Sequence, residues 1–376
     1  MALETSPNGH AAVLCAFHNG NAGMYSVDLA AHQFLKDVGI AFDLYVGQTD
    51  AGNSFHKYGG MNFKVCRDQA ELQDYSHIIY WGDFLNNPVY GKAEYSYQEV
   101  GLKRSETLSL GYEAWKKVML PDRSKLSSSR VISVSNNFQG VDQKISGGEA
   151  DELAENFKTG FDAILPRDPY GLHSLRSLFP SAAGGYVEQG IDAAFLWDPH
   201  REFTLSREAK KPYFSYHFGR SNIQNSDALV RAISRATGLE ARPLDGWLAC
   251  RPRPREMMEG LVRQMAASRF VVSDTYHCCV NAMNLDVPVI GLGRSASEQI
   301  GTLGDYKKFA LFDMFNLSHR YFGFREKSIH PSEMEPLVST AIVFGRDGAP
   351  SSEFDALQAK KAVYNETLRS VLLGSE

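Results

Sequence analysis

The first 46 residues carry the pattern that most restricts the fold. Residues 11–17 (AAVLCAF) form an apolar run suited to a strand that is buried on both faces. From Val27 to Val38 the apolar side chains recur at i, i+3, i+4, i+7, i+8 and i+11, the period of a helix with one buried face. A second apolar run follows at 40–46. Since strand–helix–strand units have right-handed crossovers, these residues predict an α/β domain with a parallel sheet.

The alternation of strands and helices continues along the chain. In the first half we expect strands at 77–81, 131–134 and 163–165, and helices near 105–119, 148–159 and 170–178. In the second half we expect strands at 212–218, 270–273 and 287–292, and helices at 227–237, 257–267 and 277–285. A chain of 376 residues is longer than one hydrophobic core usually supports. We therefore predict two Rossmann-like domains with the active site in the cleft between them.

The domain limits follow from composition. Residues 198–212 are polar and charged, as expected of a linker between domains. This places a first domain at 1–197, on the acceptor side, and a second at 212–345, on the donor side. Apolar side chains on one helical face near the end predict that a helix within 346–376 packs back on the first domain.

Charge and cysteine content exclude several functional classes. The net charge is −5 and the pI is about 6.1, without the basic face of a nucleic-acid-binding protein. No apolar run approaches the roughly 18 residues of a membrane span, and the N-terminus does not resemble a secretory signal. The five cysteines include no C-x-x-C pair, so we expect neither a disulfide framework nor a zinc site. A cytoplasmic protein without metal fits best.

Candidate site residues of the first half follow predicted strands, where open α/β sheets bind ligands. The loop after 11–17 contains Asn19, Gly20, Asn21 and Gly23. Its glycines permit close approach of a ligand to N–H groups at a helix N-terminus, although a plain turn is the alternative. Trp81 and Asp83 end the strand at 77–81, where a carboxylate suits a sugar hydroxyl, and a capping turn is the alternative.

The second half carries the sharper candidates. His217 and Arg220 follow the strand at 212–218, where a guanidinium beside a glycine turn suits a carboxylate or phosphate. The segment from Ser273 through Thr275 to His277 turns from a strand into a helix. A histidine at a helix N-terminus donates to an anion or transfers a proton near neutral pH. A capped turn with a hydrogen-bonded histidine is the structural alternative.

Taken together, these segments resemble the polysaccharide pyruvyl transferase family. The family has a strand followed by R-x-H and then G-x-P-x-I, which is similar to VVSDTYH and the later VPVIG here. The family's GN-x-GD loop is similar to residues 19–23. Its RD-x-S helix start is similar to residues 167–170, and its PDPAFLL stretch is similar to residues 190–196. The segments follow the family's order across roughly residues 11–300.

The resemblance implies a GT-B-like pair of Rossmann domains and a ketal-forming transferase without metal or redox cofactor. The reaction implied moves pyruvate from phosphoenolpyruvate onto two hydroxyls of a sugar, with loss of phosphate. We expect His277 to act as the acid or as a hydrogen-bond donor to the phosphate. We expect Asp83 or Asp192 to activate the sugar hydroxyl. The residues expected to bind the donor are Arg220, His217, Ser273, Thr275 and Arg294. The residues expected to bind the acceptor are Asn19, Gly20, Asn21, Gly23 and Trp81.

Two departures from the family pattern keep alternatives open. Thr275 stands where the family has arginine, and Met24 where it has an acidic residue. Arg220 or Arg294 then substitutes, or the donor differs. One alternative is a GT-B glycosyltransferase that uses a nucleotide sugar, and another is a non-catalytic carbohydrate-binding relative. Residues 47–75, 84–100 and 305–330, expected on the acceptor side, show no pattern that identifies the sugar. A glycolipid acceptor implies peripheral membrane association.

Overall fold

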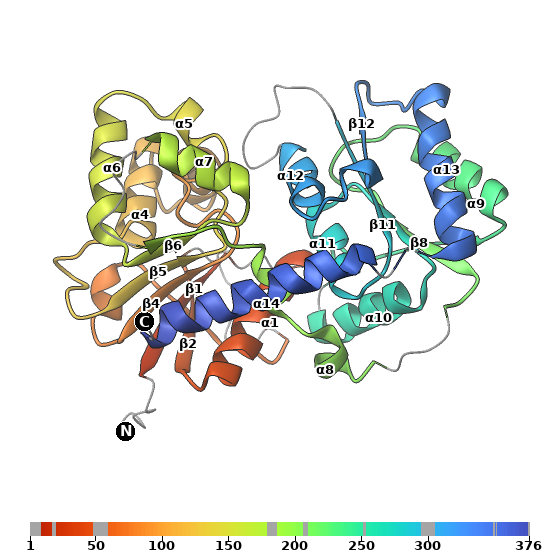
Figure 1. The fold of residues 1–376 in the computed structure, drawn as a ribbon. Coiled ribbons are helices and arrows are strands. Elements are labelled where there is room, and N and C mark those ends of the chain that lie inside the picture. Colours follow the sequence, from red (N-terminus) through yellow and green to blue (C-terminus); the bar gives the residue numbers. More distant parts are fainter. Residues whose placement is uncertain are drawn as a thin grey trace. The chain divides into compact units, whose positions relative to one another are not determined.

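Two parallel sheets organise the chain, and each is the centre of its own unit (Figure 1). The computed structural model describes residues 9–16, 20–47, 59–178, 186–205, 210–250, 253–294, 305–348, 350 and 352–374. Unit 1 comprises Met1–Phe17, Val27–Leu196 and Tyr364–Glu376, and unit 2 comprises His18–Ser26 and Trp197–Val363. The short segment before Val27 therefore groups with the second unit, although we expected it in the first.

The sheet of unit 1 has the order β3-β2-β1-β4-β5-β6-β7, and its strands pair in parallel. Its strands are β1 (His10–Cys15), β2 (Ala41–Val46), β3 (Phe63–Val65), β4 (His77–Trp81), β5 (Arg130–Val134), β6 (Ala163–Leu165) and β7 (Tyr186–Val187). The order reverses between β1 and β4, which makes the carboxyl ends of these strands the expected place for a ligand.

Helices connect the strands of unit 1. They are α1 (Ala22–Val38), η1 (Gln69–Leu72), α2 (Pro88–Tyr90), the π-helix η2 (Gly91–Tyr95), α3 (Ser96–Gly101), α4 (Leu108–Met119), α5 (Val141–Lys144), α6 (Gly148–Gly160), α7 (Pro169–Leu178) and η3 (Ala193–Leu196). Residues 84–100, which showed no pattern in the sequence, fold as short helical turns at the end of β4.

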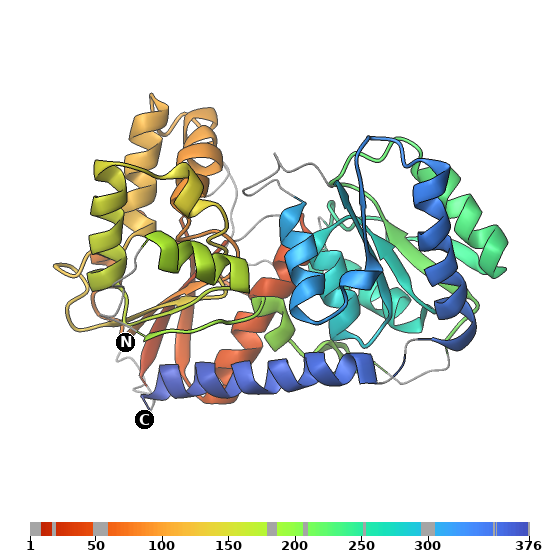
Figure 2. The same ribbon diagram turned by 45° about the horizontal axis from the view of Figure 1, so that its top comes forward.

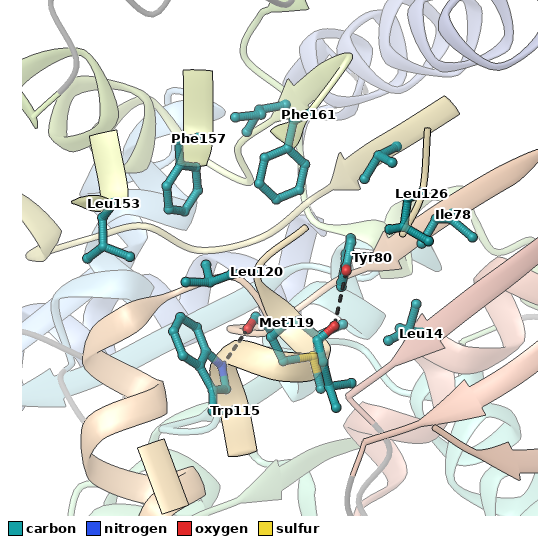
Figure 3. Close-up of a cluster of buried hydrophobic side chains, with 14 of the residues drawn as sticks. Leu14, Ile78, Tyr80, Trp115, Met119, Leu120, Leu126, Leu153, Phe157 and Phe161 are labelled. Carbon is teal, nitrogen blue, oxygen red and sulfur yellow. Dashed lines mark hydrogen bonds between the residues drawn. The ribbon is translucent and has the colours of Figure 1, made fainter. Parts of the chain in front are cut away.

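Aromatic side chains with satisfied polar groups fill the core of unit 1 (Figure 3). The indole N–H of Trp115 donates to the Leu85 carbonyl at 2.9 Å, and the hydroxyl of Tyr80 donates to the Val118 carbonyl at 3.0 Å. Both side chains are fully buried. Because their polar atoms have partners, they contribute apolar burial without an unsatisfied group.

The sheet of unit 2 has the order β12-β11-β10-β8-β9, again with parallel pairing. Its strands are β8 (Tyr213–His217), β9 (Glu240–Pro243), β10 (Val271–Ser273), β11 (Val289–Arg294) and β12 (Tyr321–Phe324). Its helices are α8 (Pro199–Phe203), α9 (Ser226–Thr237), α10 (Pro254–Ala267), α11 (Tyr276–Asn284), α12 (Tyr306–Met314), η4 (Ser318–Arg320) and α13 (Pro331–Asp347). Helices α9 and α13 lie side by side (Figures 1 and 2). The order reverses between β8 and β10.

The C-terminal helix is α14 (Ser352–Leu373), and its last turns belong to unit 1. The hydroxyls of Tyr364 and Ser135 are 2.8 Å apart, and the ring of His77 hydrogen-bonds to the Leu372 carbonyl at 3.0 Å. The expectation that this helix packs on the first domain is confirmed. The class of two parallel α/β domains is confirmed as well.

Candidate functional site

Unit 2 reverses its strand order where β8 and β10 lie next to each other. The two strands pair in a register that sets Ser273 opposite His217 at their carboxyl ends. Helix α11 begins three residues after Ser273, at Tyr276. The strand-to-helix corner predicted from the sequence therefore lies at the reversal point of the sheet, where this class of fold binds its ligands.

Ser273 and Thr275 hold this corner in shape. The hydroxyl of Ser273 donates to the His217 carbonyl at 2.9 Å and accepts the Thr275 N–H at 3.0 Å. The Thr275 hydroxyl donates to Asp274 at 3.1 Å. Ser273 is fully buried and Thr275 nearly so. Both hydroxyls thus take part in hydrogen bonds within the fold, and their expected contact with the donor stays a prediction.

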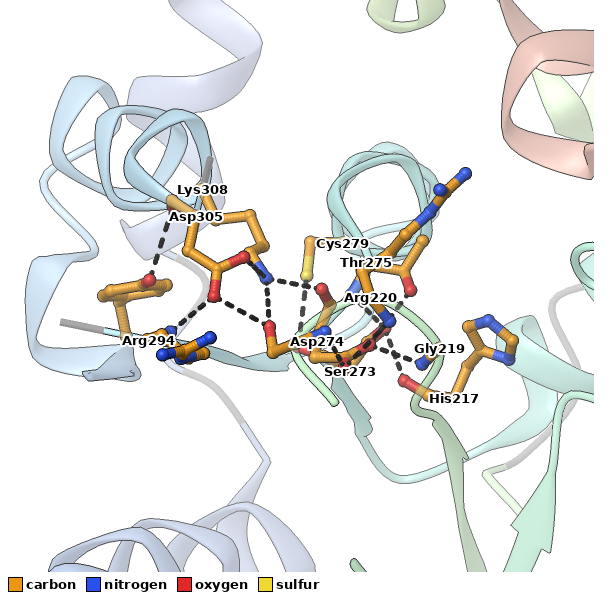
Figure 4. Close-up of polar contacts among 12 residues, drawn as sticks. His217, Gly219, Arg220, Ser273, Asp274, Thr275, Cys279, Arg294, Asp305 and Lys308 are labelled. Atoms are coloured by element: carbon orange, nitrogen blue, oxygen red, sulfur yellow. Dashed lines mark hydrogen bonds and ion pairs between the residues drawn. The ribbon is translucent and has the colours of Figure 1, made fainter. Parts of the chain in front are cut away.

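Asp274 ties this corner to the loop after β8. Its carboxylate accepts the backbone N–H groups of Gly219, Arg220 and Ser221 at 2.8, 3.1 and 2.7 Å (Figure 4). The residue has no exposed surface. Three hydrogen bonds from consecutive amides compensate the desolvation of a buried carboxylate and fix the loop. The sequence does not indicate these contacts, because the partners of Asp274 lie more than 50 positions away.

A buried lysine links the same corner to β11 and α12. The ammonium of Lys308 donates to the Asp274 carbonyl at 2.6 Å and to the Ser221 hydroxyl at 2.7 Å, and it lies 2.6 Å from Asp305 (Figure 4). Asp305 also accepts the Ser221 hydroxyl at 2.9 Å and the N–H of Arg294 at 2.5 Å. This pair was not predicted from the sequence. The sequence signal that could have indicated the pair is the spacing of Asp305 and Lys308, three residues apart at the start of α12.

Arg220 and Arg294 contrast with this buried network. Arg220 is exposed, and in Figure 4 its side chain points away from Asp274 while its backbone N–H points to it. Arg294 ends β11 and is half-buried. Within the described ranges neither guanidinium forms an ion pair. Their main chains are thus fixed by buried carboxylates, whereas no carboxylate among the described residues pairs with their charges.

His277 lies in the first turn of α11, with 9% of its surface exposed. Its ring meets the ring of Tyr276 edge to face at 5.2 Å. A Cβ atom built on Gly23 would overlap the Cβ of His277, so only glycine permits this approach. The histidine is a buried corner residue with a small accessible surface.

The loop before α1 belongs to this site of unit 2. The N–H of Ala22 donates to the Trp247 carbonyl at 2.9 Å, and the Gly20 carbonyl accepts the N–H of Cys250 at 2.9 Å. The Asn21 side chain accepts the Gly23 N–H at 3.0 Å. Gly20, Asn21 and Gly23 were expected in the first domain, whereas they group with unit 2, as His277 does. Their expected contact with the acceptor stays a prediction. Asn19 lies outside the described residues.

His217 adds a second imidazole at the end of β8. Its ring centroid is 6.2 Å from that of Trp247, and no described residue hydrogen-bonds to Nε2. Burial lowers the pKa of His217, while the charge of Asp274 and a hydrogen bond to the Leu244 backbone raise this pKa. The pKa of His217 therefore lies below that of a free imidazole.

Trp81 belongs to the core of unit 1. It is fully buried, and its indole N–H donates to the Val27 carbonyl at 3.0 Å. The expectation that Trp81 binds the acceptor is wrong, because the ring has no accessible surface. Gly82, the next residue, has φ of +76° and lies against Val27, where an added Cβ would be 2.7 Å from the valine methyl.

Asp83 and Asp192 share a buried arginine. Asp83 has φ of +53° and lies 3.9 Å from Arg167. Asp192 lies 3.4 Å from Arg167 and accepts the N–H of Ala194 at 2.9 Å. The Asp192 side chain is 2% exposed against 22% for Asp83. Asp192 is thus buried and bound within the fold, and its expected role in activating a hydroxyl stays a prediction. Asp83 keeps an accessible carboxylate on a strained backbone.

The described ranges contain no cluster of three His, Cys, Asp or Glu side chains that would hold a metal ion. All five cysteines are free and buried. No helix in the described part of the chain has the length and apolar character needed to cross a bilayer.

Comparisons with solved structures support the fold. A protein from Listeria monocytogenes described as a UDP-N-acetylglucosamine 2-epimerase has a TM-score of 0.52 at 10% identity, covering 96% of this chain and 95% of that one. The UDP-GlcNAc 2-epimerase of Methanocaldococcus jannaschii has a TM-score of 0.46 at 11% identity, over 96% and 99%. An uncharacterized protein of Klebsiella pneumoniae has a TM-score of 0.43 at 15% identity, over 81% and 87%. The Listeria similarity confirms the GT-B-like fold class and nothing further.

Comparison with protein families gives the more specific result. No curated protein sequence matches the chain. The family model described as polysaccharide pyruvyl transferase matches residues 130–296. This region contains β8, β10 and α11, the three elements that form the corner of unit 2. Over residues 130–296, which include His217, Arg220 and His277, the chain therefore matches the polysaccharide pyruvyl transferase family, and the expected resemblance to this family of transferases is confirmed.

Proposed function

We propose that this chain transfers a pyruvyl group from phosphoenolpyruvate to two hydroxyls of a sugar in a cell-surface polysaccharide or its precursor. The observation that carries the proposal is the corner of unit 2, where His277 and the loop of Arg220 lie within the segment that matches the pyruvyl transferase family. Phosphoenolpyruvate carries a carboxylate and a phosphate, and two arginines whose charges are available suit these two anions.

The reaction requires an acid, a base and positive charge. The methylene carbon of phosphoenolpyruvate takes a proton, which leaves positive charge on C2. One sugar hydroxyl then attacks C2 and loses its proton to a base, so that C2 carries both the sugar oxygen and the phosphate. The second hydroxyl attacks C2 while the bond from C2 to the phosphate oxygen breaks. Its proton leaves with the phosphate, and the product is a cyclic ketal.

We assign these roles to residues that follow the strands. His277 is the proposed proton donor to the methylene carbon, because it lies on the corner at the reversal point of the sheet, within the segment that matches the family. Arg220 and Arg294 are the proposed anion ligands. Asp83 is the proposed base for the sugar hydroxyl, because Asp192 is occupied by Arg167 and Ala194. The cleft between the two domains stays a prediction.

The test is phosphate release from phosphoenolpyruvate over a panel of hexose acceptors. We expect His277→Ala to lower the rate by about 10²–10⁴-fold, the usual range for loss of a general acid. His173→Ala is the matched control, because His173 is an exposed histidine on α7 of unit 1. If the His277 variant releases phosphate as fast as this control, the assignment of His277 is wrong.

Thr275 favours one competing proposal, in which the donor is a nucleotide sugar. It stands where the family has arginine, so one expected phosphate ligand is absent. Thermal shift separates the two donors. Stabilisation by phosphoenolpyruvate supports pyruvyl transfer, whereas stabilisation by a nucleoside diphosphate alone supports glycosyl transfer.

The acceptor determines where the enzyme works. We propose a cytoplasmic reaction on a free sugar or a glycolipid precursor, since phosphoenolpyruvate is a cytoplasmic metabolite. With a glycolipid acceptor, the enzyme should sediment with vesicles that contain the acceptor and stay in the supernatant with vesicles that lack it.

A further inference from the structure

We propose that Asp274 is the positioning residue of the donor-binding arginine Arg220. Its carboxylate holds the backbone of residues 219–221, and this loop presents the Arg220 guanidinium to the anionic donor. The inference rests on the proposed function only for the identity of the donor. The loop geometry itself comes from described contacts within unit 2.

The three amides converge on one carboxylate. Gly219 donates to one oxygen of Asp274 at 2.8 Å, and Arg220 and Ser221 donate to the other at 3.1 and 2.7 Å. A concave run of backbone N–H groups is a general anion-binding feature of proteins. Here the protein's own carboxylate fills it. These amides are therefore unavailable to a donor phosphate, and positive charge at this corner has to come from side chains.

The loop has no regular structure of its own that would hold Arg220. It lies between β8 and α9 and contains Asn222 in a left-handed conformation, with φ of +52°. An exposed arginine on an untethered loop loses much conformational freedom when it binds a ligand, which weakens binding. With Asp274 in place only the side chain remains to be ordered. We infer that this arrangement keeps the affinity for an anion high.

Asp274 is itself held on two sides. The Thr275 hydroxyl donates to its carboxylate at 3.1 Å, and the Lys308 ammonium donates to its main-chain carbonyl at 2.6 Å. Lys308 also binds Ser221 at 2.7 Å, so the lysine joins the corner and the loop directly. The carboxylate cannot leave the loop without breaking several buried hydrogen bonds.

A double-mutant cycle tests whether Asp274 acts through Arg220. The measurements are the KM for phosphoenolpyruvate, the KM for the acceptor and the Kd for inorganic phosphate, on the full chain. We expect Asp274→Asn to raise the KM for phosphoenolpyruvate and the phosphate Kd about tenfold or more, because the amide replaces an acceptor oxygen with a donor. The acceptor KM should change by less than about twofold. Arg220→Ala should give the same pattern, and the double variant should be no weaker than Arg220→Ala alone.

Two further variants serve as a control and as a fallback. Asp227→Asn is the matched control, because Asp227 is exposed in the first turn of α9 and lies outside the network; it should leave all three constants unchanged. If Asp274→Asn does not fold, Thr275→Val removes one hydrogen bond to the carboxylate at nearly constant shape. It should raise the KM for phosphoenolpyruvate and the phosphate Kd by a smaller factor, with the acceptor KM unchanged.

The outcomes separate the inference from the proposed function. The inference is overturned if the effects of Asp274→Asn and Arg220→Ala multiply in the double variant. It is also overturned if the fallback variant leaves the phosphate Kd unchanged, or if the wild type does not bind phosphate. If the wild type binds phosphate but does not turn over phosphoenolpyruvate, only the proposed function is contradicted. The double-mutant cycle is then evaluated with the phosphate Kd of each variant.

Discussion

Asp28 offers a direct test of how burial affects a carboxyl group in unit 1. It lies on α1 and has no exposed surface. Among the described residues, the thiol of Cys15 is the side chain that lies close enough to act on the Asp28 carboxyl as a hydrogen-bond donor. Burial raises the pKa of Asp28 well above its usual value, and Asp83 raises it further, while Cys15 acts in the opposite direction. We expect Asp28 to be protonated in the folded protein over a wide pH range.

The sign of the pH dependence follows from proton counting. In the unfolded chain an aspartate releases its proton near pH 3.9. Above that pH the folded protein still holds the proton of Asp28, so the free energy of unfolding falls as the pH rises, until the raised folded pKa is passed. One proton changes this free energy by about 1.4 kcal/mol per pH unit. The side-chain amide introduced by Asp28→Asn does not titrate, so the variant lacks this loss.

The informative quantity is the stability of Asp28→Asn minus that of the wild type. A buried amide without a partner costs about 1–3 kcal/mol, but that cost does not depend on pH. The difference should therefore move in favour of Asp28→Asn by up to about 1.4 kcal/mol per pH unit above pH 4. Urea denaturation between about pH 4.5 and 7.5 measures it. Asp37→Asn, an exposed position on α1, is the control and should give a constant difference. A constant difference for Asp28→Asn refutes the reasoning.

Two other substitutions test contacts at the edges of the two sheets. Gly23→Ala places a Cβ against the Cβ of His277; it should lower stability by about 1–3 kcal/mol in urea denaturation and slow phosphate release, and unchanged turnover would show that this packing is irrelevant to the site. Arg167→Met removes the cation shared by buried carboxylates and should cost about 3–5 kcal/mol in urea denaturation. Arg123→Met, which breaks a partly exposed pair with Asp162, should cost about 0–1 kcal/mol, and equal losses in the two arginine variants would contradict the argument.

The central strands of both sheets could be predicted because burial leaves a clear sequence pattern. The strands β1, β4, β5, β8 and β10 are apolar runs that end in turns, and α1 and α6 show helical periodicity. The edge strands carry no such pattern. β3 and β7 have three and two residues, and β9 contains charged residues that face solvent. Hydrophobic periodicity does not detect strands that are both short and exposed.

The candidate site was predicted in part, and the errors share one cause. The corner at Ser273–His277 was found because a strand, polar residues and a helix follow each other directly. The burial of Trp81 and Asp192 could not be predicted, because their contacts with the Val27 carbonyl and the Arg167 guanidinium are set by tertiary packing. Lys308 was missed for the same reason. Local sequence shows where a polar group lies along the chain, but not whether another residue of the folded protein already hydrogen-bonds to it or pairs with its charge.

The exchange of the family arginine for Thr275 is consistent with the rest of the corner. The Thr275 hydroxyl donates to Asp274, whose oxygens also receive three backbone N–H groups. The backbone amides are thus committed to an internal carboxylate. Asp305 holds the main chain of Arg294 in the way that Asp274 holds that of Arg220. An anionic donor at this edge of the sheet would therefore meet two cationic side chains on fixed backbones. We propose that the guanidinium groups of Arg220 and Arg294 supply the charge that is missing at position 275.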